Sequence, residues 1–309
     1  MIKFSFFLPA FKAKYLDKAI SSIVQQSFKD WELLIVNDAS PEDLNSIIEP
    51  YLANPNVRYY QNEKNKGRTD LVGFWNSYLP VCSGEFIVFA SDDDIYDPDY
   101  LREMLSLTER FPDCDLYHCR IRFIDERGSI IQVAQPAQCY ETQMDFIYQR
   151  LVWKRKQTLQ EFLFRRSALI NKGGIVSFPL AWASDSATAY LMAERGVAYT
   201  GKVLFSLRMS KKNISSETNY AAQKIEAMKL SGQWLQGFLT SVKCFSQEEE
   251  FMKKEALRIS NAEKYASFPR YLQNLSLPNF RKEMKYIAQH HIFSWRTRLL
   301  LFFKRLILR

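Results

Sequence analysis

Residues 84–98 read GEFIVFASDDDIYDP, and this stretch decides the fold class of the chain. The apolar run Phe86–Ala90 has the length of a buried strand, and polar residues follow it at once. The same order recurs at Ile2–Leu8 and again at Leu33–Val36, which ends in Asn37-Asp38. The sequence therefore predicts several short buried strands that each end in a turn able to carry functional groups.

Helical patterns separate these strands. Apolar residues recur at helical spacing from Tyr15 to Val24, and the pattern then predicts helices over 44–52, 69–79 and 99–110 and strands over 57–60, 116–124 and 203–207. Strands that alternate with helices predict βαβ units, and hence an α/β fold with a mostly parallel, doubly wound sheet flanked by helices. From about residue 218 the strand pattern stops, and a helical C-terminal region is predicted.

The composition excludes several classes of protein. The 309 residues are 47% hydrophobic, which is enough for a full core and excludes wholesale disorder. Five scattered cysteines form no C-x-x-C pair, so they favour a reducing cytoplasm over a disulfide framework. Three histidines are too few for a histidine-rich metal site, and no apolar run reaches the roughly 18 residues that a membrane span needs.

The net charge of +8 is concentrated at the C-terminal end. Residues 284–309 contain six basic residues and no acidic one: Lys285, Arg296, Arg298, Lys304, Arg305 and Arg309. Apolar residues share one helical face there: Ile292, Trp295, Leu299, Phe302 and Leu306. This pattern predicts a basic amphipathic helix that suits an anionic membrane surface, although packing on protein is an alternative. Because the excess charge sits on this helix, no nucleic-acid partner is indicated.

Three adjacent aspartates, Asp92, Asp93 and Asp94, are the strongest chemical signal. Their carboxylates repel one another unless a cation or solvent screens them, and oxygen ligands alone suit Mg²⁺ or Mn²⁺. An acidic turn that caps the helix starting near Pro98 is the alternative. Ligands of open parallel sheets bind outside the carboxyl ends of the strands, and this position favours a metal site.

The segments Phe4–Pro9, Trp31–Ser40 and Gly84–Ile87, which runs on into Asp93, Asp94 and Pro98, resemble glycosyltransferase family 2. The resemblance covers about the first 210 residues. It implies the GT-A fold and a catalytic domain over residues 1–215, with a nucleotide-sugar half at about 1–98 and an acceptor half at about 99–215. Residues 216–309 would form the helical region.

By this resemblance, one group of residues binds the nucleotide. Asp38 matches the aspartate that contacts the uracil of a UDP-sugar. Pro9 and Phe11 match the start of the nucleotide pocket, and Asn65 and Arg68 match a polar loop beside it. A solvated loop residue is an equal alternative for Arg68.

A second group matches residues near the diphosphate. Asp94 matches the aspartate that coordinates Mn²⁺ or Mg²⁺, and Asp93 lies beside it near the metal or the ribose. Ser91 stands where the family often has an aspartate. Arg208 and Lys211 match basic residues of a flexible segment that closes over the diphosphate, with a solvated basic loop as the alternative.

Asp185 matches the catalytic base of the family, and Ser184 replaces the glutamate that often precedes it. A base must come within about 3 Å of the acceptor hydroxyl to accept its proton. Capping of the helix that begins here is the alternative role, and both roles are compatible.

The resemblance thus implies a metal-dependent, inverting hexosyl- or N-acetylhexosaminyltransferase. It would move a sugar from a UDP-sugar to a hydroxyl of a glycan or lipid-linked glycan, in bacterial surface polysaccharide or glycolipid synthesis. The expected location is cytoplasmic, peripheral on the inner face of the cell membrane. A sugar-nucleotide nucleotidyltransferase is an alternative, but Pro9–Lys14 lacks its Gly-rich basic loop. A non-catalytic module that binds nucleotide sugars is another.

Overall fold

The structure is a computed structural model, and it describes residues 2–209, 221–266, 280–282, 284, 285 and 289. The chain divides into two compact units. Of the described residues, the sheet unit contains 2–177 and 184–209, and the helical unit contains 178–183 and those from 221 onward. The domain boundary predicted at residue 215 lies outside the described residues.

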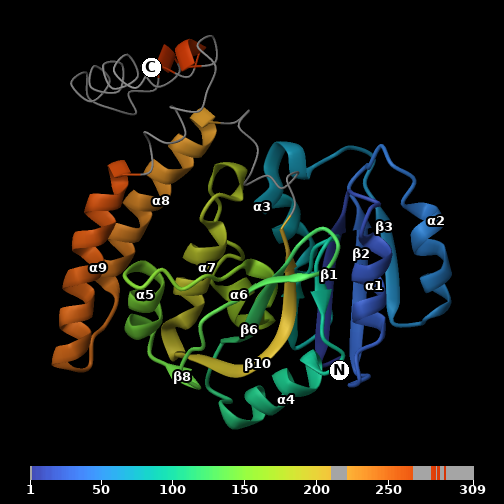
Figure 1. Cartoon of the computed structure of the whole chain (residues 1–309), viewed down its shortest axis with the longest axis horizontal. Helices are drawn as coiled ribbons and strands as arrows, with labels where there is room; N and C mark the ends of the chain where they lie inside the picture. The colour runs from blue at the N-terminus through green and yellow to red at the C-terminus, as the bar shows by residue number, and fades with distance from the viewer. Residues whose placement is uncertain (1, 210–220, 267–279, 283, 286–288, 290–309) are drawn as a thin grey trace. The chain divides into compact units, whose positions relative to one another are not determined.

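Within the described residues, ten strands form one sheet in the sheet unit (Figure 1). The strands are β1 (Phe4–Ala10), β2 (Trp31–Asn37), β3 (Val57–Gln61), β4 (Phe86–Phe89), β5 (Ile95–Tyr96), β6 (Leu116–Ile124), β7 (Ile130–Val133), β8 (Tyr140–Glu141), β9 (Phe162–Arg165) and β10 (Val197–Arg208). Their order is β3-β2-β1-β4-β9-β6-β10-β5, with β7 beside β6 and β8 beside β10.

The two halves of the sheet differ in strand direction. Strands β3, β2, β1 and β4 run parallel, as the alternating sequence predicts. Strand β9 is antiparallel to both β4 and β6, and β10 pairs parallel with β6 but antiparallel with β5 and β8. Antiparallel strands need no crossover helix, so the alternating pattern does not reveal them. The α/β class is confirmed, with more antiparallel pairing than the sequence predicts.

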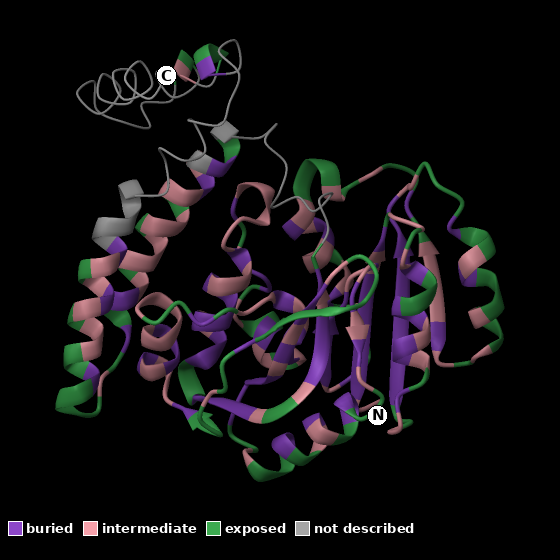
Figure 2. Cartoon of the chain, viewed as in Figure 1, coloured by how far each residue is buried: buried purple, intermediate pink, exposed green. Residues whose placement is uncertain are grey.

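Helices cover both faces of this sheet. They are α1 (Leu16–Val24), α2 (Asn45–Ile48), α3 (Gly67–Tyr78), α4 (Tyr100–Arg110), α5 (Gln143–Leu151), α6 (Arg166–Asn171) and α7 (Ser184–Met192), with short 3₁₀ turns at Glu49–Ala53, Leu159–Glu161 and Ala193–Arg195. Figure 2 shows the central strands largely buried between them, whereas β7 is exposed.

Side chains alternate between the two faces along each strand, which assigns the helices to faces. On β1, Phe6 belongs to a core that α1 and α4 share. Phe7 points the other way and packs on Phe74 and Tyr78 of α3. On β6, Tyr117 belongs to the α1–α4 core, whereas the neighbouring residue packs on α5. Apolar burial of this kind contributes about 1.5–3 kcal/mol for each large side chain.

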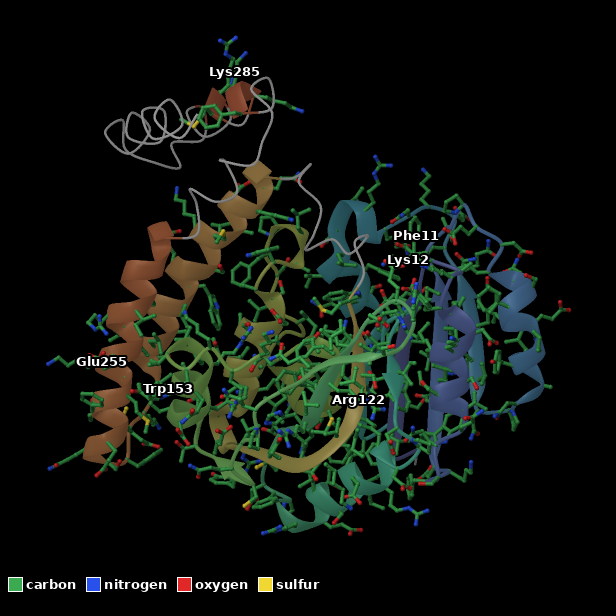
Figure 3. The ribbon with its side chains drawn as sticks, viewed as in Figure 1. Phe11, Lys12, Arg122, Trp153, Glu255 and Lys285 are labelled. Carbon is green, nitrogen blue, oxygen red and sulfur yellow. The ribbon has the colours of Figure 1, made fainter. Side chains whose placement is uncertain are left out.

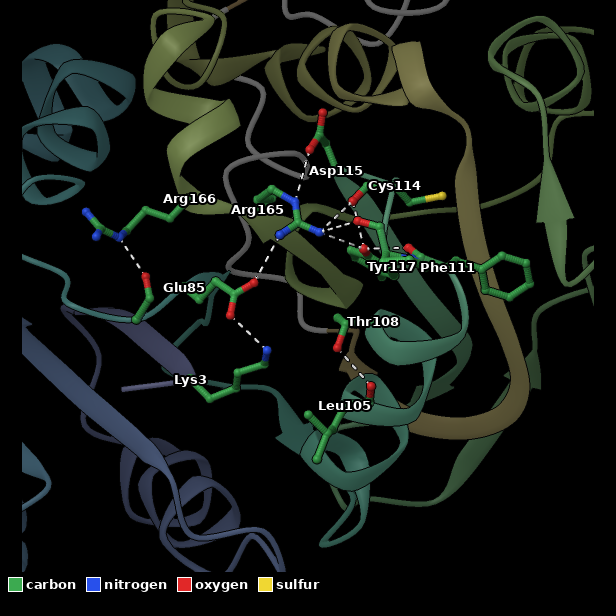
Figure 4. Close-up of polar contacts among 12 residues, drawn as sticks. Lys3, Glu85, Leu105, Thr108, Phe111, Cys114, Asp115, Tyr117, Arg165 and Arg166 are labelled. Atoms are coloured by element: carbon green, nitrogen blue, oxygen red, sulfur yellow. Dashed lines mark hydrogen bonds and ion pairs between the residues drawn. The ribbon is translucent and has the colours of Figure 1, made fainter. Parts of the chain in front are cut away.

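Ion pairs tie four strands together at the amino ends of the parallel strands (Figure 4). The Nζ of Lys3, before β1, lies 2.8 Å from Glu85, before β4. Arg165 of β9 lies 3.0 Å from Glu85 and 3.2 Å from Asp115, which precedes β6. This network lies at the opposite ends of the parallel strands from the aspartates, so its role is structural.

The helical unit contains α8 (Ala221–Ser241), α9 (Gln247–Ala266) and the 3₁₀ turn Pro179–Ala181. Trp234 of α8 stacks on Phe238 with ring centroids 4.8 Å apart and meets Phe178 edge-on. Lys253 of α9 donates to the carbonyl oxygen of Val242 at 2.6 Å, just beyond the C-terminal end of α8. These helices agree with the predicted helical region.

The predicted membrane-binding helix and the predicted absence of disulfides can be compared with the structure. The basic amphipathic helix predicted within 292–309 lies outside the described residues. Among the helices that are described, none is long and apolar enough to cross a membrane. All five cysteines lie in the described part of the chain, and each is a free thiol.

Candidate functional site

The carboxyl ends of three neighbouring parallel strands bring the candidate site together. Residue for residue, β1 pairs with β2 up to Ala10 and Asn37, and with β4 up to Phe7 and Phe89. The Asp38 N–H continues the ladder by donating to the carbonyl oxygen of Ala10 at 3.1 Å. The turns that follow these three strands therefore meet at one edge of the sheet.

Asp92 joins the turn after β4 to the turn after β1. Its buried Oδ2 accepts hydrogen bonds from the backbone N–H groups of Phe11, at 2.8 Å, and Lys12, at 2.7 Å. Burial raises its pKa to about 6. The sequence analysis assigned no separate role to Asp92, and only the strand register reveals that it holds the predicted nucleotide loop. Pro9 lies in β1 opposite Val36, and the ring of Phe11 is 38% exposed.

The carboxylates of Asp93 and Asp94 both lie beside the hydroxyl of Ser91. The Ser91 hydroxyl lies 3.1 Å from Asp93 Oδ1 and also within hydrogen-bond reach of Asp94 Oδ2. Asp94 Oδ1 accepts from the N–H of Arg208 at 2.7 Å, while Lys12 Nζ lies 3.5 Å from Asp93 Oδ2. Burial first, and then the negative charge of Asp93, raise the pKa of Asp94 to about 8. A cation beside these groups would relieve both effects.

These two carboxylates fit a hard divalent cation that also binds a substrate. Among the residues that the structure describes, no three His, Cys, Asp or Glu side chains are placed to hold a metal ion together. Mg²⁺ commonly binds one or two carboxylates and completes its shell with phosphate oxygens and water. Asp93 and Asp94 supply that number of carboxylates.

Arg208 lies elsewhere than predicted. The sequence predicts a flexible loop at this position, after a strand ending at residue 207, but Arg208 is the last residue of β10 and its side chain is buried. Its Nε donates to the carbonyl oxygen of Asp93 and its terminal nitrogen to that of Asp125, both at 2.9 Å. The guanidinium also lies 4.2 Å from the ring centre of Tyr15. Arg208 therefore fixes the aspartate turn, and Lys211 lies outside the described residues.

Asp38 organises the loop that follows β3. Its carboxylate accepts from the side-chain amide of Asn62 at 2.7 Å, from the N–H of Lys66 at 2.9 Å and from the N–H of Gly67 at 2.7 Å. A Cβ added at Gly67 would lie 3.0 Å from Asp38 Oδ2. Ala39 adopts a left-handed backbone with φ of 52°, a strained state that often marks functional sites.

The polar loop predicted beside the nucleotide leads directly from Asp38 into α3. Asn65 Oδ1 accepts from the N–H of Arg68 at 2.8 Å, which closes the first turn of the helix. Arg68 itself is exposed. The structure thus brings this loop to Asp38 and leaves the Arg68 guanidinium at the surface.

Asp185 is the second residue of α7. Burial raises the pKa of its carboxyl group, and the positive charge of Arg150 opposes this shift. A terminal nitrogen of Arg150 lies 3.4 Å from the hydroxyl of Ser186. Two residues shortly before the helix, Ala181 and Ala183, have left-handed φ values of 53° and 64°. A carboxylate with a raised pKa at a strained segment suits a proton acceptor.

A buried polar cluster beside α5 was missed by the sequence analysis. His118 Nδ1 lies 3.2 Å from Glu161 Oε1, and burial lowers the pKa of His118 and raises that of Glu161, which favours the neutral form of each. Arg155 makes two parallel hydrogen bonds to Glu141, at 2.6 and 2.7 Å. No motif in the sequence joins these residues, because each pair forms only when distant turns meet.

Both the sequence and the fold of this chain are similar to those of known proteins. Residues 5–172 match Glycosyl transferase family 2. Protein CgeD of Bacillus subtilis (strain 168) is 30% identical over 129 residues, which cover 39% of this chain and 30% of CgeD. Poly(ribitol-phosphate) beta-N-acetylglucosaminyltransferase TarS of Staphylococcus aureus (strain Mu50) is 25% identical over 246 residues, covering 74% of this chain and 41% of TarS. The chain spans less than half the length of these relatives.

Solved structures agree in fold. S. aureus TarS 1–349 in complex with UDP-GlcNAc superposes with a TM-score of 0.69 at 18% identity, over 93% of this chain and 80% of that one. The mannosyltransferase PcManGT from Pyrobaculum calidifontis, in complex with GDP-Man and Mn²⁺, gives 0.57 at 16% identity, over 99% and 80%. The GT-A-like fold is confirmed. Because the family match covers more than half of its residues, the chain belongs to glycosyltransferase family 2.

Proposed function

We propose that this protein is a metal-dependent, inverting glycosyltransferase that moves a sugar from a UDP-sugar to an acceptor hydroxyl in surface glycan synthesis. Family membership supports sugar transfer, and the complex of the related TarS fold with UDP-GlcNAc supports a UDP-linked donor. The observation that carries the proposal is the meeting of Asp38, Asp92 and Asp94 at one sheet edge, where three parallel strands end.

The nucleotide would lie over the turns after β1, β2 and β3. An ionised carboxylate offers about four acceptor positions, and the loop after β3 uses three of those on Asp38. The remaining position can accept the imide N–H of uracil. The half-exposed ring of Phe11 offers a surface on which the base can stack. In this proposal Pro9, Asn65 and Arg68 complete the pocket.

Asp93 and Asp94 would hold Mn²⁺ or Mg²⁺, which supplies positive charge for the leaving diphosphate. Asp94 is kept in place by the hydroxyl of Ser91 and the N–H of Arg208. The Arg208 guanidinium adds a fixed positive charge behind the same turn. Lys211, outside the described residues, is proposed to contact the diphosphate.

Asp185 is proposed as the base. Its carboxylate accepts the proton of the acceptor hydroxyl while that oxygen bonds to the anomeric carbon from the side opposite the diphosphate. The bond from the anomeric carbon to the phosphate oxygen breaks, and UDP leaves with its electron pair. Such proton transfer typically contributes a factor of about 10² to 10⁴ in rate.

The remaining parts of the proposal concern location. Residues up to about 98 would bind the donor, and the rest of the domain up to about 215 would face a glycan or lipid-linked glycan acceptor. The basic helix within 292–309 would attach the protein to the inner face of the cell membrane. Deleting residues 293–309 should then abolish partition onto anionic vesicles, and unchanged partition would refute the attachment.

Turnover of candidate donors tests the function directly. The full chain is incubated with UDP-GlcNAc, UDP-glucose or UDP-galactose, with Mn²⁺ or with a chelator, and the UDP released as water accepts the sugar is measured. We expect release with one donor, dependent on the metal and reduced about 10² to 10⁴-fold in Asp185→Asn. Asp99→Asn, which removes an exposed carboxylate at the start of α4, is the matched control and should be fully active. Donor binding without UDP release would instead indicate a binding module. Conversion of the UDP-sugar and added pyrophosphate into UTP and sugar 1-phosphate would indicate a nucleotidyltransferase.

A further inference from the structure

We infer that the acceptor carries a phosphate group near its accepting hydroxyl, and that Arg120 and Arg122 of β6 bind this phosphate. The inference rests on the proposed function, because it places an acceptor beside Asp185. It goes further by naming the chemical class of the acceptor and the two residues that select it.

The two arginines lie on one face of β6. Their neighbours Cys119, Ile121 and Phe123 point into the core on the α1–α4 side and are buried. Alternation therefore places Arg120 and Arg122 on the opposite face, in line with His118. Unlike His118, both arginines are only partly buried, so solvent or a ligand can reach them.

Each guanidinium is held in place by its inner nitrogen. Arg120 Nε donates to the carbonyl oxygen of Ala134 at 2.7 Å, and Arg122 Nε donates to the Ser206 hydroxyl at 2.6 Å. Within the described residues, no acidic side chain forms an ion pair with either arginine, and neither terminal NH₂ group has a hydrogen-bond partner. Two fixed, half-buried forks with unused donors are suited to an anion with several oxygens.

Strand pairing places the two guanidinium groups between the proposed metal site and the proposed base. Ser206 pairs with Arg122 on one side and with Ile95, the residue after Asp94, on the other. Two strand spacings separate Arg122 from Ile95, which is roughly 10 Å. The Asp94 site therefore lies to one side of the two arginines, across β10.

On the other side of the arginines, packed side chains connect β6 to the helix that carries the proposed base. His118, two residues before Arg120, packs on Phe146 of α5, and Phe146 packs on Tyr190 of α7, the helix that carries Asp185. In the view of Figure 3, Trp153, after α5, is to the left of Arg122, and Phe11 and Lys12, after β1, are above it and to its right. In this proposal the acceptor occupies this part of the sheet face.

A phosphate of the donor is a poorer match for these arginines. The predicted diphosphate site lies at the turn of Asp93 and Asp94, and the two strand spacings across β10, roughly 10 Å, separate that turn from Arg122. A neutral glycan would leave two half-buried cations without a counter-charge, which is unfavourable. A phosphodiester of a polyol phosphate polymer, or the phosphate of a polyprenyl carrier, would satisfy both forks.

Equilibrium binding to the full chain, without any donor, tests the inference. Three probes are compared: a soluble glycerol phosphate oligomer, a short-chain polyprenyl phosphate in neutral detergent micelles, and a neutral malto-oligosaccharide. We expect one anionic probe to bind more tightly than the neutral sugar and to lose affinity as salt rises. The anionic probe that binds identifies the source of the phosphate.

Arg120→Gln and Arg122→Gln should each weaken this binding about tenfold or more, since each removes charged hydrogen bonds. Arg122→Lys keeps the charge but loses the fork, so an intermediate loss is expected. Arg110→Gln removes the same charge from the exposed end of α4, on the other face of the sheet, and should bind as the wild type does.

The inference is overturned if neither anionic probe binds better than the neutral sugar, or if the two glutamine variants bind like the wild type. Stabilisation by UDP, measured on the same variants, should be unchanged and reports both folding and the donor site. If the wild type does not bind UDP, the result would count against the proposed function. Loss of anion binding alone would count only against this inference.

Discussion

The proposed donor half, up to about residue 98, and the proposed acceptor half, from there to about residue 215, are held together in different ways. In the donor half, Asp38, Asp92 and Asp94 each accept hydrogen bonds from backbone N–H groups that the strand register brings to them. In the acceptor half, two buried pairs form between side chains, Arg155 with Glu141 and His118 with Glu161. Backbone donors fix a site through the fold itself, whereas side-chain pairs can change without altering the fold. The donor site should therefore be the less variable chemistry of the two.

The largest effect is expected at the buried ion pair of the acceptor half. Arg155→Ala leaves Glu141 as an uncompensated buried charge and should lower the free energy of unfolding by about 3–5 kcal/mol. Chemical denaturation measures it. The double variant Arg155→Met/Glu141→Leu should be much less destabilised.

The exposed pair of Lys14 with Glu126 provides the control for this change. Lys14→Ala should cost only about 0–1 kcal/mol, because solvent screens exposed pairs. If Arg155→Ala and Lys14→Ala lower the free energy of unfolding equally, the buried pair does not stabilise the acceptor half more than an exposed pair would.

A smaller loss is expected in the donor half. Asp92→Ala leaves the N–H groups of Phe11 and Lys12 without their acceptor, at a cost of about 1–3 kcal/mol for each one that stays buried. Since Asp92 is not itself proposed to touch the donor, UDP should still bind, with reduced affinity. Calorimetric titration with UDP and Mn²⁺ measures this, and an unchanged affinity would contradict the positioning role.

The pH dependence of stability probes Asp94. Its pKa is raised to about 8 from an ordinary value of 3.8, so the folded protein holds this proton more tightly than the unfolded chain does. The contribution of Asp94 to the unfolding free energy of the metal-free protein should therefore fall as pH rises from about 4 to about 8. Denaturation in chelator at several pH values should show this slope, and Asp94→Asn should flatten it. A slope unchanged in Asp94→Asn would show that other groups cause it.

The smallest effect is expected at Gly67. A methyl group there would press on Asp38 Oδ2, so Gly67→Ala should cost about 1 kcal/mol and weaken UDP binding several-fold. Gly237→Ala in α8 meets no atom within 4 Å and should instead stabilise its helix by about 1 kcal/mol. Thermal melts of the two variants, with and without UDP, separate crowding at Asp38 from a general effect of alanine.

The same contrast explains what the sequence could reveal. Strands β1 to β4 alternate with helices, so their positions along the chain and the turns carrying Asp38 and Asp94 could be predicted from periodicity and the family resemblance. Strand β9 has only four residues and pairs antiparallel, so no pattern marked it. Asp92 and Arg208 could not be given their positions, because both act on backbone atoms of segments far away in the sequence.

The central claim, that the carboxyl ends of β1, β2 and β4 form a metal-assisted UDP site, is tested most directly by thermal melting. The full chain is melted with UDP, GDP, CDP or dTDP, each with Mn²⁺ or with chelator. We predict that UDP with Mn²⁺ stabilises the protein, by roughly 2.7 kcal/mol at 100 times the dissociation constant. Asp94→Asn should abolish this gain, and Asp99→Asn should keep it. If no nucleotide raises the melting temperature, or if Asp94→Asn keeps the full gain, the claim is wrong.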